Sequence, residues 1–526
     1  MSVSLSRQKD NVAWMRTLGI ACALAALIVR PVLAAERWPY GDAAVAAFQK
    51  GDFAAALTAL RGELAKCDES KPAADECLNL LLALSNIAGQ AGDPKTGEGY
   101  ARSALLLATR TLPEGHPEIA TGWNNLALNI SSQGRYAEAD PLYRKALALR
   151  EAALPAGHLD IAKSWNNLAA NIESQGRYAE AEPLHRKALA LYEAALPAGH
   201  PDIAMSWNNL AANIGSQGRD AEAEPLYRKA LALLEAALPA GHPYIATSWS
   251  NLATNIGSQG RYAEAEPVLR KALALREAAL PAGHPDIASS WNSLAANVDA
   301  QGRFAEAEPL YRKALALYEA GLPAGHPDIA MSWNNLAHSI NRQGKHAEAE
   351  PLYRKALVLR EAALPAGHPS IALSWHNLAA NIASQGRYAE AEPLYRRALA
   401  LYEAALPTGH PDIATSWSNL AHNINAQGRY TEAESLFRKA LAIRDGLVRS
   451  HPDRIVGYWA MAANIQVQRK GAAGVRSLYR EAERGVVERV ASFRDFGPAA
   501  QAELRAYRPI YTGQVRAAWD LAAGAR

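Results

Sequence analysis

Residues 158–199, HLDIAKSWNNLAANIESQGRYAEAEPLHRKALALYEAALPAG, are one copy of the sequence unit that decides the fold. A tryptophan recurs every 42 residues from Trp123 to Trp459, and a histidine precedes nearly every one of these tryptophans by seven residues. Eight such units fill residues 116–450. Self-similarity at a fixed period of this length indicates a stacked-repeat architecture rather than a globular enzyme.

Each unit predicts two helices joined by a turn. The first, called helix A below, is outlined in the quoted unit by apolar residues at 3- and 4-residue spacing: Ile161, Trp165, Leu168 and Ile172. Gly176, within Ser-Gln-Gly-Arg, supplies the turn. The second, helix B, has an apolar face made by Tyr178, Ala181, Leu184, Ala188 and Leu191. In most units a proline and an acidic residue follow the histidine, and both suit a helix N-terminus.

The unit resembles a tetratricopeptide repeat. The residues that fall on that family's signature of small and large side chains are Trp165, Leu168, Ala169, Gly176, Tyr178, Ala181 and Ala188. The 42-residue length and the wording NNLA…QGRYAEAEPLYRKAL are most similar to the kinesin-light-chain-like subtype. The resemblance implies an all-α fold, in which tandem helix-turn-helix repeats stack as a right-handed superhelix, an α-solenoid, with helix A on the concave face.

The repeats weaken toward both ends of the chain. Residues 41–115 are predicted to be degenerate N-terminal units, and residues 451–486 a degenerate final unit. Residues 487–526 are predicted to form C-terminal capping helices. This tail has a faint resemblance to the segment that joins such repeats to caspase-like CHAT peptidases. No peptidase domain follows it in the sequence, so the resemblance implies no activity here.

Residues 1–34 have the pattern of an export signal. Basic residues precede an apolar run of twelve residues from Leu18 to Val29, and small residues follow near Ala34. The run is shorter than the roughly 20 residues that span a bilayer. We therefore expect cleavage near Ala34 and a periplasmic or secreted protein with no membrane span in the mature chain. Arg30, directly after the run, leaves an uncleaved N-terminal anchor as the alternative.

The mature chain would retain only Cys67 and Cys77. Two cysteines in an oxidising compartment favour a disulfide, with two free thiols as the alternative. This prediction depends on export. The bridge would close a short loop between two helices and hold the N-terminal cap together.

Composition and motifs exclude several function classes. The 55 Lys and Arg residues nearly balance the 52 Asp and Glu residues, so no basic surplus favours a nucleic acid partner. The sequence has no zinc-protease motif, nucleophile elbow, phosphate-binding loop or dinucleotide-binding glycine pattern. The once-per-unit histidines lack a second ligand at short spacing, so turn packing or helix capping is expected rather than metal binding. We predict no enzyme activity, no cofactor and no metal site.

Asparagines recur in helix A although Asn is less favourable there than Ala by about 0.5–0.7 kcal/mol. We predict that a first row lies in the concave groove and binds a peptide backbone. The first row consists of Asn125, Asn167, Asn209, Asn251, Asn335, Asn377 and Asn419. A second row, four residues later, is expected to form a structural ladder between helices, since a buried amide must find hydrogen-bond partners. The second row consists of Asn129, Asn171, Asn213, Asn255, Asn297, Asn381 and Asn423.

Differences between the units gather at three positions of helix A that we expect to face the groove. His338, Arg342, His376 and His422 occur at or beside these positions in consecutive units. They predict a weakly basic patch in the groove, with ligand binding that changes between about pH 5 and pH 8. Random drift on a solvated face is the alternative.

Two function classes remain open from the sequence. The first is a non-enzymatic protein-protein interaction scaffold that binds an extended peptide or a partner helix in the concave groove. The second is a structural spacer or assembly module whose groove is idle. A further alternative, an accessory chain of a separately encoded CHAT-type peptidase, requires a partner that supplies the chemistry. The expected partner is a protein or peptide, and the oligomeric state is left open.

Overall fold

A computed structural model of the chain describes residues 42–49, 52–67, 74–447, 449–468, 472–491, 501 and 504–524. Helices form the described part of the chain, and no strand occurs within it. The predicted signal, residues 1–34, lies outside the described residues. No helix among those described combines the length and apolar character needed to cross a membrane.

Sixteen helices form the central array as eight consecutive hairpins. Helices A are α6 (Pro117–Ser132), α8 (Leu159–Glu173), α10 (Pro201–Ser216), α12 (Pro243–Ser258), α14 (Pro285–Ala300), α16 (Pro327–Arg342), α18 (Pro369–Ser384) and α20 (Pro411–Ala426). Helices B are α7 (Tyr136–Ala153), α9 (Tyr178–Ala195), α11 (Asp220–Ala237), α13 (Tyr262–Ala279), α15 (Phe304–Gly321), α17 (His346–Ala363), α19 (Tyr388–Ala405) and α21 (Tyr430–Arg444). The predicted all-α fold of tandem helical hairpins is confirmed.

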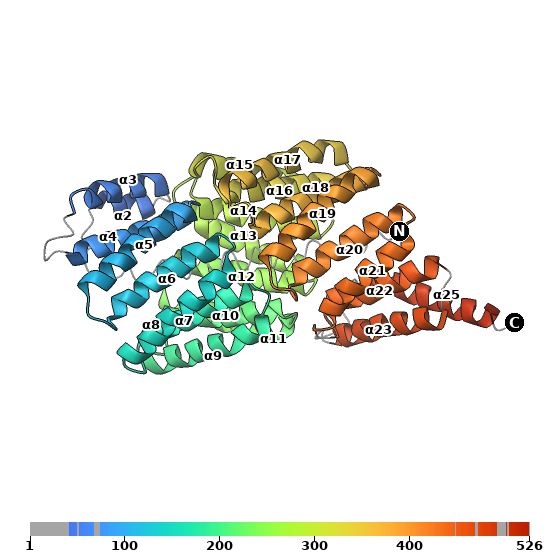
Figure 1. The fold of residues 1–526 in the computed structure, drawn as a ribbon, viewed down its shortest axis with the longest axis horizontal. Coiled ribbons are helices and arrows are strands. Elements are labelled where there is room, and N and C mark those ends of the chain that lie inside the picture. Colours follow the sequence, from blue (N-terminus) through green and yellow to red (C-terminus); the bar gives the residue numbers. More distant parts are fainter. Residues whose placement is uncertain are drawn as a thin grey trace.

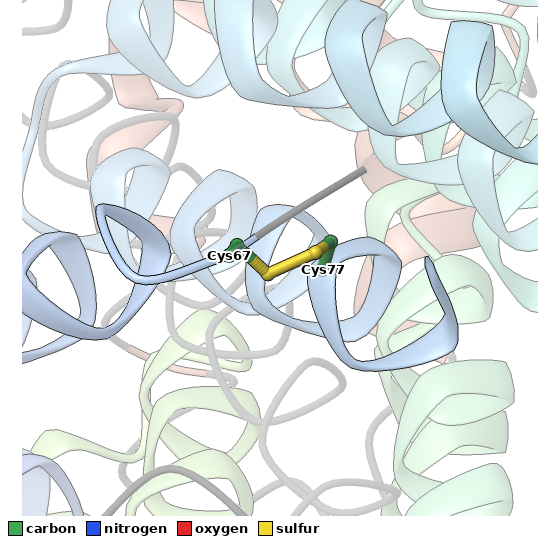
Figure 2. Close-up of a disulfide and its surroundings, with 2 residues drawn as sticks. All are labelled: Cys67 and Cys77. Atoms are coloured by element: carbon green, nitrogen blue, oxygen red, sulfur yellow. A yellow bond between two sulfur atoms is a disulfide. The ribbon is translucent and has the colours of Figure 1, made fainter. Parts of the chain in front are cut away.

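Further hairpins extend the array at both ends. Before it come α2 (Asp42–Gln49) with α3 (Phe53–Leu64), then α4 (Ala74–Gln90) with α5 (Pro94–Thr111). After it come α22 (Pro452–Val467), α23 (Ala472–Ala491) and α25 (Arg508–Gly524), which packs on α23. Cys67, just after α3, and Cys77, in the first turn of α4, form a disulfide (Figure 2). The bridge therefore ties the two N-terminal hairpins together.

Local sequence explains where each hairpin turns. In the third unit, Nδ1 of His200 accepts the backbone N–H of Asp202 at 3.2 Å, and Pro201 opens α10. The predicted capping role of the histidine is thus confirmed. At the turn between α10 and α11, Gly218 has a φ of 81°, a backbone conformation that residues other than glycine adopt only at a cost in free energy.

Each helix A packs against helix B of its own unit and helix B of the unit before it. Leu210, Ala211 and Ile214 of α10 are almost completely buried between them. Trp207 is half-buried at the edge of this core, and its Nε1 donates to Oε1 of Glu193 in α9 at 3.0 Å. The recurring tryptophan is therefore a packing residue that also bonds to the preceding hairpin, because burial of its ring leaves one polar atom to satisfy.

The array winds so tightly that one turn of the superhelix contacts the next. Imidazole rings at the start of late helices A lie against glycines at the end of early helices A, about 234 residues earlier in the chain. The pairs are His326 with Gly92, His368 with Gly134, His410 with Gly176 and His451 with Gly218. We call these four pairs the seam. In Figure 1 the helices run roughly along the length of the molecule, and α4 and α5 of the earlier turn point toward α14–α16 of the later one.

Helices A form the inner layer of the superhelix and helices B the outer layer. In the eight helices A, residues that are freely exposed occur only at the helix ends: Ser132, Asp286, Asp412 and Ala426. In each helix B, exposed residues recur at helical spacing along the whole element, for example Glu222, Lys229 and Glu235 in α11. The solvent-facing surface of the array is therefore made mainly by helices B.

Candidate functional site

The first asparagine row bonds one helix A to the helix A before it. Nδ2 of Asn167 donates to Oδ1 of Asn124 at 2.8 Å, and the same bond joins Asn335 to Asn292 and Asn377 to Asn334, each at 2.9 Å. In the unit of Asn419 the acceptor is Nε2 of His376, at 2.7 Å. Four of the seven asparagines of the first row therefore join neighbouring helices, a role that the sequence led us to expect of the second row.

Burial divides the first row into two groups. Asn125, Asn209, Asn251 and Asn335 are buried, whereas Asn167, Asn377 and Asn419 are half-buried. Only the half-buried group has surface that a ligand can touch without a rearrangement. Peptide binding by the first row remains a prediction.

The second row bonds helix A to the start of the preceding helix B. Nδ2 of Asn171 donates to the backbone carbonyl of Tyr136 at 3.1 Å, and Asn423 donates to that of Tyr388 at 2.9 Å. Asn213, Asn255 and Asn381 make the equivalent bonds to Tyr178, Asp220 and His346. The structural ladder predicted for this row is confirmed, and it explains why Asn is retained despite its cost in a helix.

The quoted unit carries two coupled differences from the other units. His185, in α9, stands where all seven other central units have Tyr, Phe or Leu, and Glu173, at the end of α8, contacts it. Nε2 of His185 lies 3.2 Å from Oε1 of Glu173, while its Nδ1 lies 2.9 Å from Oδ1 of Asn166. Asn166 therefore turns toward helix B, and Nδ2 of Asn209 has no partner among the described residues. One substitution thus interrupts the amide ladder at this unit.

The predicted basic patch is not a solvated surface. His376 is buried, packs edge-on against Tyr395 with ring centroids 5.3 Å apart, and accepts the bond from Asn419. His422 packs similarly against Phe437, with ring centroids 4.8 Å apart. The guanidinium of Arg342 lies over the ring of Phe304, at 5.0 Å from its centroid. These side chains pack within and between hairpins, because their positions on helix A face helix B as well as the interior.

Burial lowers the pKa of His338, His376 and His422 to about 4, with the charges of Arg342 and Arg444 adding to the effect at His338 and His422. All three imidazoles are therefore neutral between pH 5 and pH 8. The predicted change of binding over that range is wrong for these residues, because a charged imidazole is disfavoured where water is excluded.

A third ladder, which the sequence analysis missed, joins each unit to the next. Oε2 of Glu182 in α9 accepts from Nε2 of Gln217 at 2.8 Å and from Nη1 of Arg219 at 2.7 Å, and both donors lie in the turn between α10 and α11. Arg186, one helical turn away, donates to Oε1 at 2.6 Å. The same arrangement recurs at Glu224, Glu266, Glu350 and Glu392. The signal was present in the sequence as a recurring Glu-Pro in helix B and a recurring Gln-Gly-Arg in the turn.

These glutamates are held in their charged form. Burial alone would raise the pKa of Glu224, but bonds from Gln259, Arg228 and Arg261 lower it to about 2. The pKa of Glu182, Glu266, Glu350 and Glu392 is lowered to about 2 in the same way. The ladder therefore stabilises the array only while the carboxylates are ionised.

We expect the array to lose stability in acid because of this ladder. The unfolded chain binds protons at these glutamates near their ordinary pKa of 4.5, whereas the folded chain binds them only near pH 2. The free energy of unfolding should therefore fall steadily as pH drops from about 4.5 to about 2. Urea unfolding followed by circular dichroism at several pH values measures this slope.

A matched pair of variants separates the ladder from surface charge. Glu224→Gln should lower the free energy of unfolding at pH 7 by about 1–3 kcal/mol, because two arginines lose a charged acceptor. Glu222→Gln, on a carboxylate whose side chain is 49% exposed, should change it by less than about 0.5 kcal/mol. Equal effects of the two substitutions would contradict the ladder's role.

What remains accessible on the inner face is a strip of mostly uncharged side chains, many of them small. In α10 it consists of Met205, Ala212 and Ser216, all half-buried and one or two helical turns apart. The equivalent residues of α18 are Leu373, Ala380 and Ser384, also half-buried. Among the described residues, no cluster of three or more His, Cys, Asp or Glu side chains is placed to hold a metal ion. The strip therefore offers shape and hydrogen bonding.

Comparison with protein families identifies the repeats. The family model described as tetratricopeptide repeat matches residues 76–152, 160–236, 244–320 and 328–404. A second model of the same description matches residues 378–447. These matches cover more than half of the chain. No curated protein matches the sequence.

Several solved structures are similar to parts of the chain. A putative kinesin light chain with nearly identical TPR-like repeats from Podosopora anserina is 26% identical, with 39% of this chain and 97% of that chain covered and a TM-score of 0.34. BtubC (BKLC) from P. vanneervenii is 22% identical, with 44% and 91% covered and a TM-score of 0.35. A Rap protein complexed with competence and sporulation factor is 14% identical, with 70% and 98% covered and a TM-score of 0.47.

Proposed function

This chain belongs to the tetratricopeptide repeat family, and from that membership we propose that it is a non-enzymatic protein-interaction scaffold. Its ligand is an extended peptide segment of a partner protein, held along the inner face that helices A form. The tail's resemblance to CHAT-linked segments adds no activity to this proposal. Export to the periplasm or beyond is part of the proposal, and the mass of the mature N-terminus tests it: an intact Met1 in an exported sample would contradict it.

One observation carries the choice of the inner face. The helices α10, α16 and α18 present half-buried residues at the same three positions, such as Met205, Ala212 and Ser216 in α10, while amide bonds between helices A hold their spacing. Small side chains allow a peptide backbone to approach the helices closely. Asn167, Asn377 and Asn419 are the members of the first row that such a peptide would contact, since they are half-buried. The shielding of this face favours an extended chain over a bulkier partner helix.

The seam favours a second candidate function. Contacts between superhelical turns stiffen the array, because each early hairpin supports a hairpin six units later. A stiff rod of this kind suits a structural spacer or assembly module, whose partners bind its ends or its outer surface. In that case the inner face is idle.

Photo-crosslinking at two matched alanines separates these functions. Ala212 lies in α10 on the inner face, and Ala232 lies exposed in α11 on the outer face of the same hairpin. We expect a benzophenone side chain at position 212, expressed in the native compartment, to capture one partner at a defined segment, and position 232 to capture none. Ala380 and Ala400, four units further along the chain, provide a second matched pair.

The identified segment is then tested as a synthetic peptide. It should bind the purified chain, and Ala212→Arg with Ala380→Arg should abolish binding while Ala232→Arg with Ala400→Arg leaves it unchanged. Circular dichroism checks that helix content is equal in all variants. Capture from positions 232 and 400 alone would support the spacer function and overturn binding on the inner face.

A further inference from the structure

The same histidine occurs in two environments. At the seam the ring is buried in three of the four histidines, with 9% of the side chain exposed in His326, 8% in His410 and 6% in His451, and His368 is half-buried. In early units, where the described residues include no earlier turn beneath it, 42% is exposed in His158 and 34% in His200. The local sequence and the cap bond are the same in both groups. Only contact between turns distinguishes them.

Both ring nitrogens of a seam histidine are occupied in the neutral form. Nδ1 of His326 accepts the backbone N–H of Asp328 at 3.2 Å, so its Nε2 carries the proton. That Nε2 lies 3.2 Å from the carbonyl oxygen of Gln90, at the end of α4, and donates to it. His368 and His410 make the equivalent backbone bonds to Ser132 and Ser174. Each bond reaches from one turn of the superhelix to the previous one.

Several charged groups face these rings. Within its own helix, each of His326, His410 and His451 has a carboxylate oxygen 3.8 Å from Nδ1, from Asp328, Asp412 and Asp453 respectively. His368 has Ser370 in that place and the guanidinium of Arg360 nearby in α17. From the earlier turn the rings meet backbone carbonyls and glycines, together with the half-buried Tyr136, whose pKa is raised to about 12 by removal from water and, to a smaller extent, by the charge of Asp412. The nearby carboxylates also belong to exposed caps such as His158, so they do not distinguish the seam.

We propose that the seam is an acid-releasable clasp: protonation of His368 and His410 separates the two superhelical turns while the helical hairpins stay folded. A second proton on the ring removes the acceptor at Nδ1 and places a charge between two packed turns. When the two turns separate, the charged ring is hydrated again, as a ring at an exposed cap would be. The direction agrees with the pKa of His368, which burial and Arg360 lower to about 4. Between pH 6.5 and pH 4 the open form binds more protons, so acid favours opening.

Distance measurements across the seam test the proposal. Nitroxide labels at Ala137 and Ala366 lie on opposite sides of the contact between Gly134 and His368, and both positions are exposed. Labels at Ala282 and Ala366 lie on the same turn and serve as the reference. In the full chain carrying Cys22→Ala, pulsed EPR should give one short distance for the first pair at pH 7. Between pH 6 and pH 4.5 that distance should lengthen, while the reference distance and the helix content remain constant.

Histidine variants provide the matched control. His326→Asn, His368→Asn and His410→Asn together keep a capping side chain but remove the rings from the seam. This triple variant should show the long distance already at pH 7 and no further change in acid. His116→Asn, His158→Asn and His200→Asn, at the exposed caps, should preserve the wild-type profile.

Three outcomes would overturn the clasp. One is a constant distance across the seam down to pH 4.5. Another is loss of helix content at the same pH as the change in distance, since opening would then be unfolding. The third is an identical pH profile in the two triple variants.

Discussion

Replacing Leu294 by Ala is expected to lower the free energy of unfolding by about 2–5 kcal/mol. Leu294 lies in α14 with no exposed surface, within the core that runs between neighbouring hairpins. The substitution removes buried apolar surface and leaves a cavity that the surrounding helices fill only in part. Because a repeat is stabilised by its neighbours, loss of one central interface also uncouples the hairpins on its two sides.

Urea unfolding followed by circular dichroism measures both effects. The midpoint should fall, and the single transition should broaden or split as the two halves of the array unfold separately. Leu106→Ala is the control, since 69% of Leu106 is exposed, and it should change the free energy by less than about 0.5 kcal/mol. A sharp transition with an unchanged midpoint in Leu294→Ala would contradict stabilisation through stacked interfaces.

Gly176→Ala should destabilise the chain by about 2–4 kcal/mol, and Gly302→Ala by only about 1 kcal/mol. Both glycines end a helix A with similar positive φ, 74° and 80°, so both variants share a backbone cost of roughly 1–2 kcal/mol. At Gly176 a new Cβ would lie 2.8 Å from Cδ2 of His410 and 2.9 Å from Cδ of Pro411. At Gly302 no atom of the described residues lies within 4 Å of that position.

The difference between the two variants isolates the seam. The atoms that meet the new Cβ belong to rigid rings at a helix start, so the two turns must move apart to make room, at a cost typical of overpacking. Thermal and urea unfolding give the free energies, and small-angle scattering should show a longer molecule for Gly176→Ala alone. Equal destabilisation and equal dimensions would mean that the seam contributes nothing to the closed superhelix.

The three ladders all join neighbouring hairpins through polar side chains. Each uses polar residues that are unfavourable or neutral in an isolated helix, and each bonds one hairpin to the next: Asn377 to Asn334, Asn423 to Tyr388, and Gln217 to Glu182. Buried polar groups without partners are costly, so these ladders specify a single spacing between hairpins. That constant spacing is what lets small rotations accumulate regularly along the array.

The sequence by itself determined the hairpin. Apolar spacing predicted both helices, the histidine and proline predicted where helix A begins, and the glycine of Ser-Gln-Gly-Arg predicted where it ends, as at Gly218. The second amide row was also predictable, because a mid-helix Asn in every unit requires a buried partner. These features depend on contacts within one unit or between adjacent units, whose sequences repeat with few exceptions.

Tertiary structure alone decided the rest. Periodicity places Asn335 and His376 on a face of helix A, but only the angle between hairpins decides whether that face meets a ligand or a neighbouring helix. The seam is even harder to predict from the sequence. Whether His410 reaches Gly176 depends on the summed rotation of six hairpins, and a few degrees of error in each would move the turns apart. Local sequence sets each rotation only approximately, whereas packing along the whole array fixes their sum.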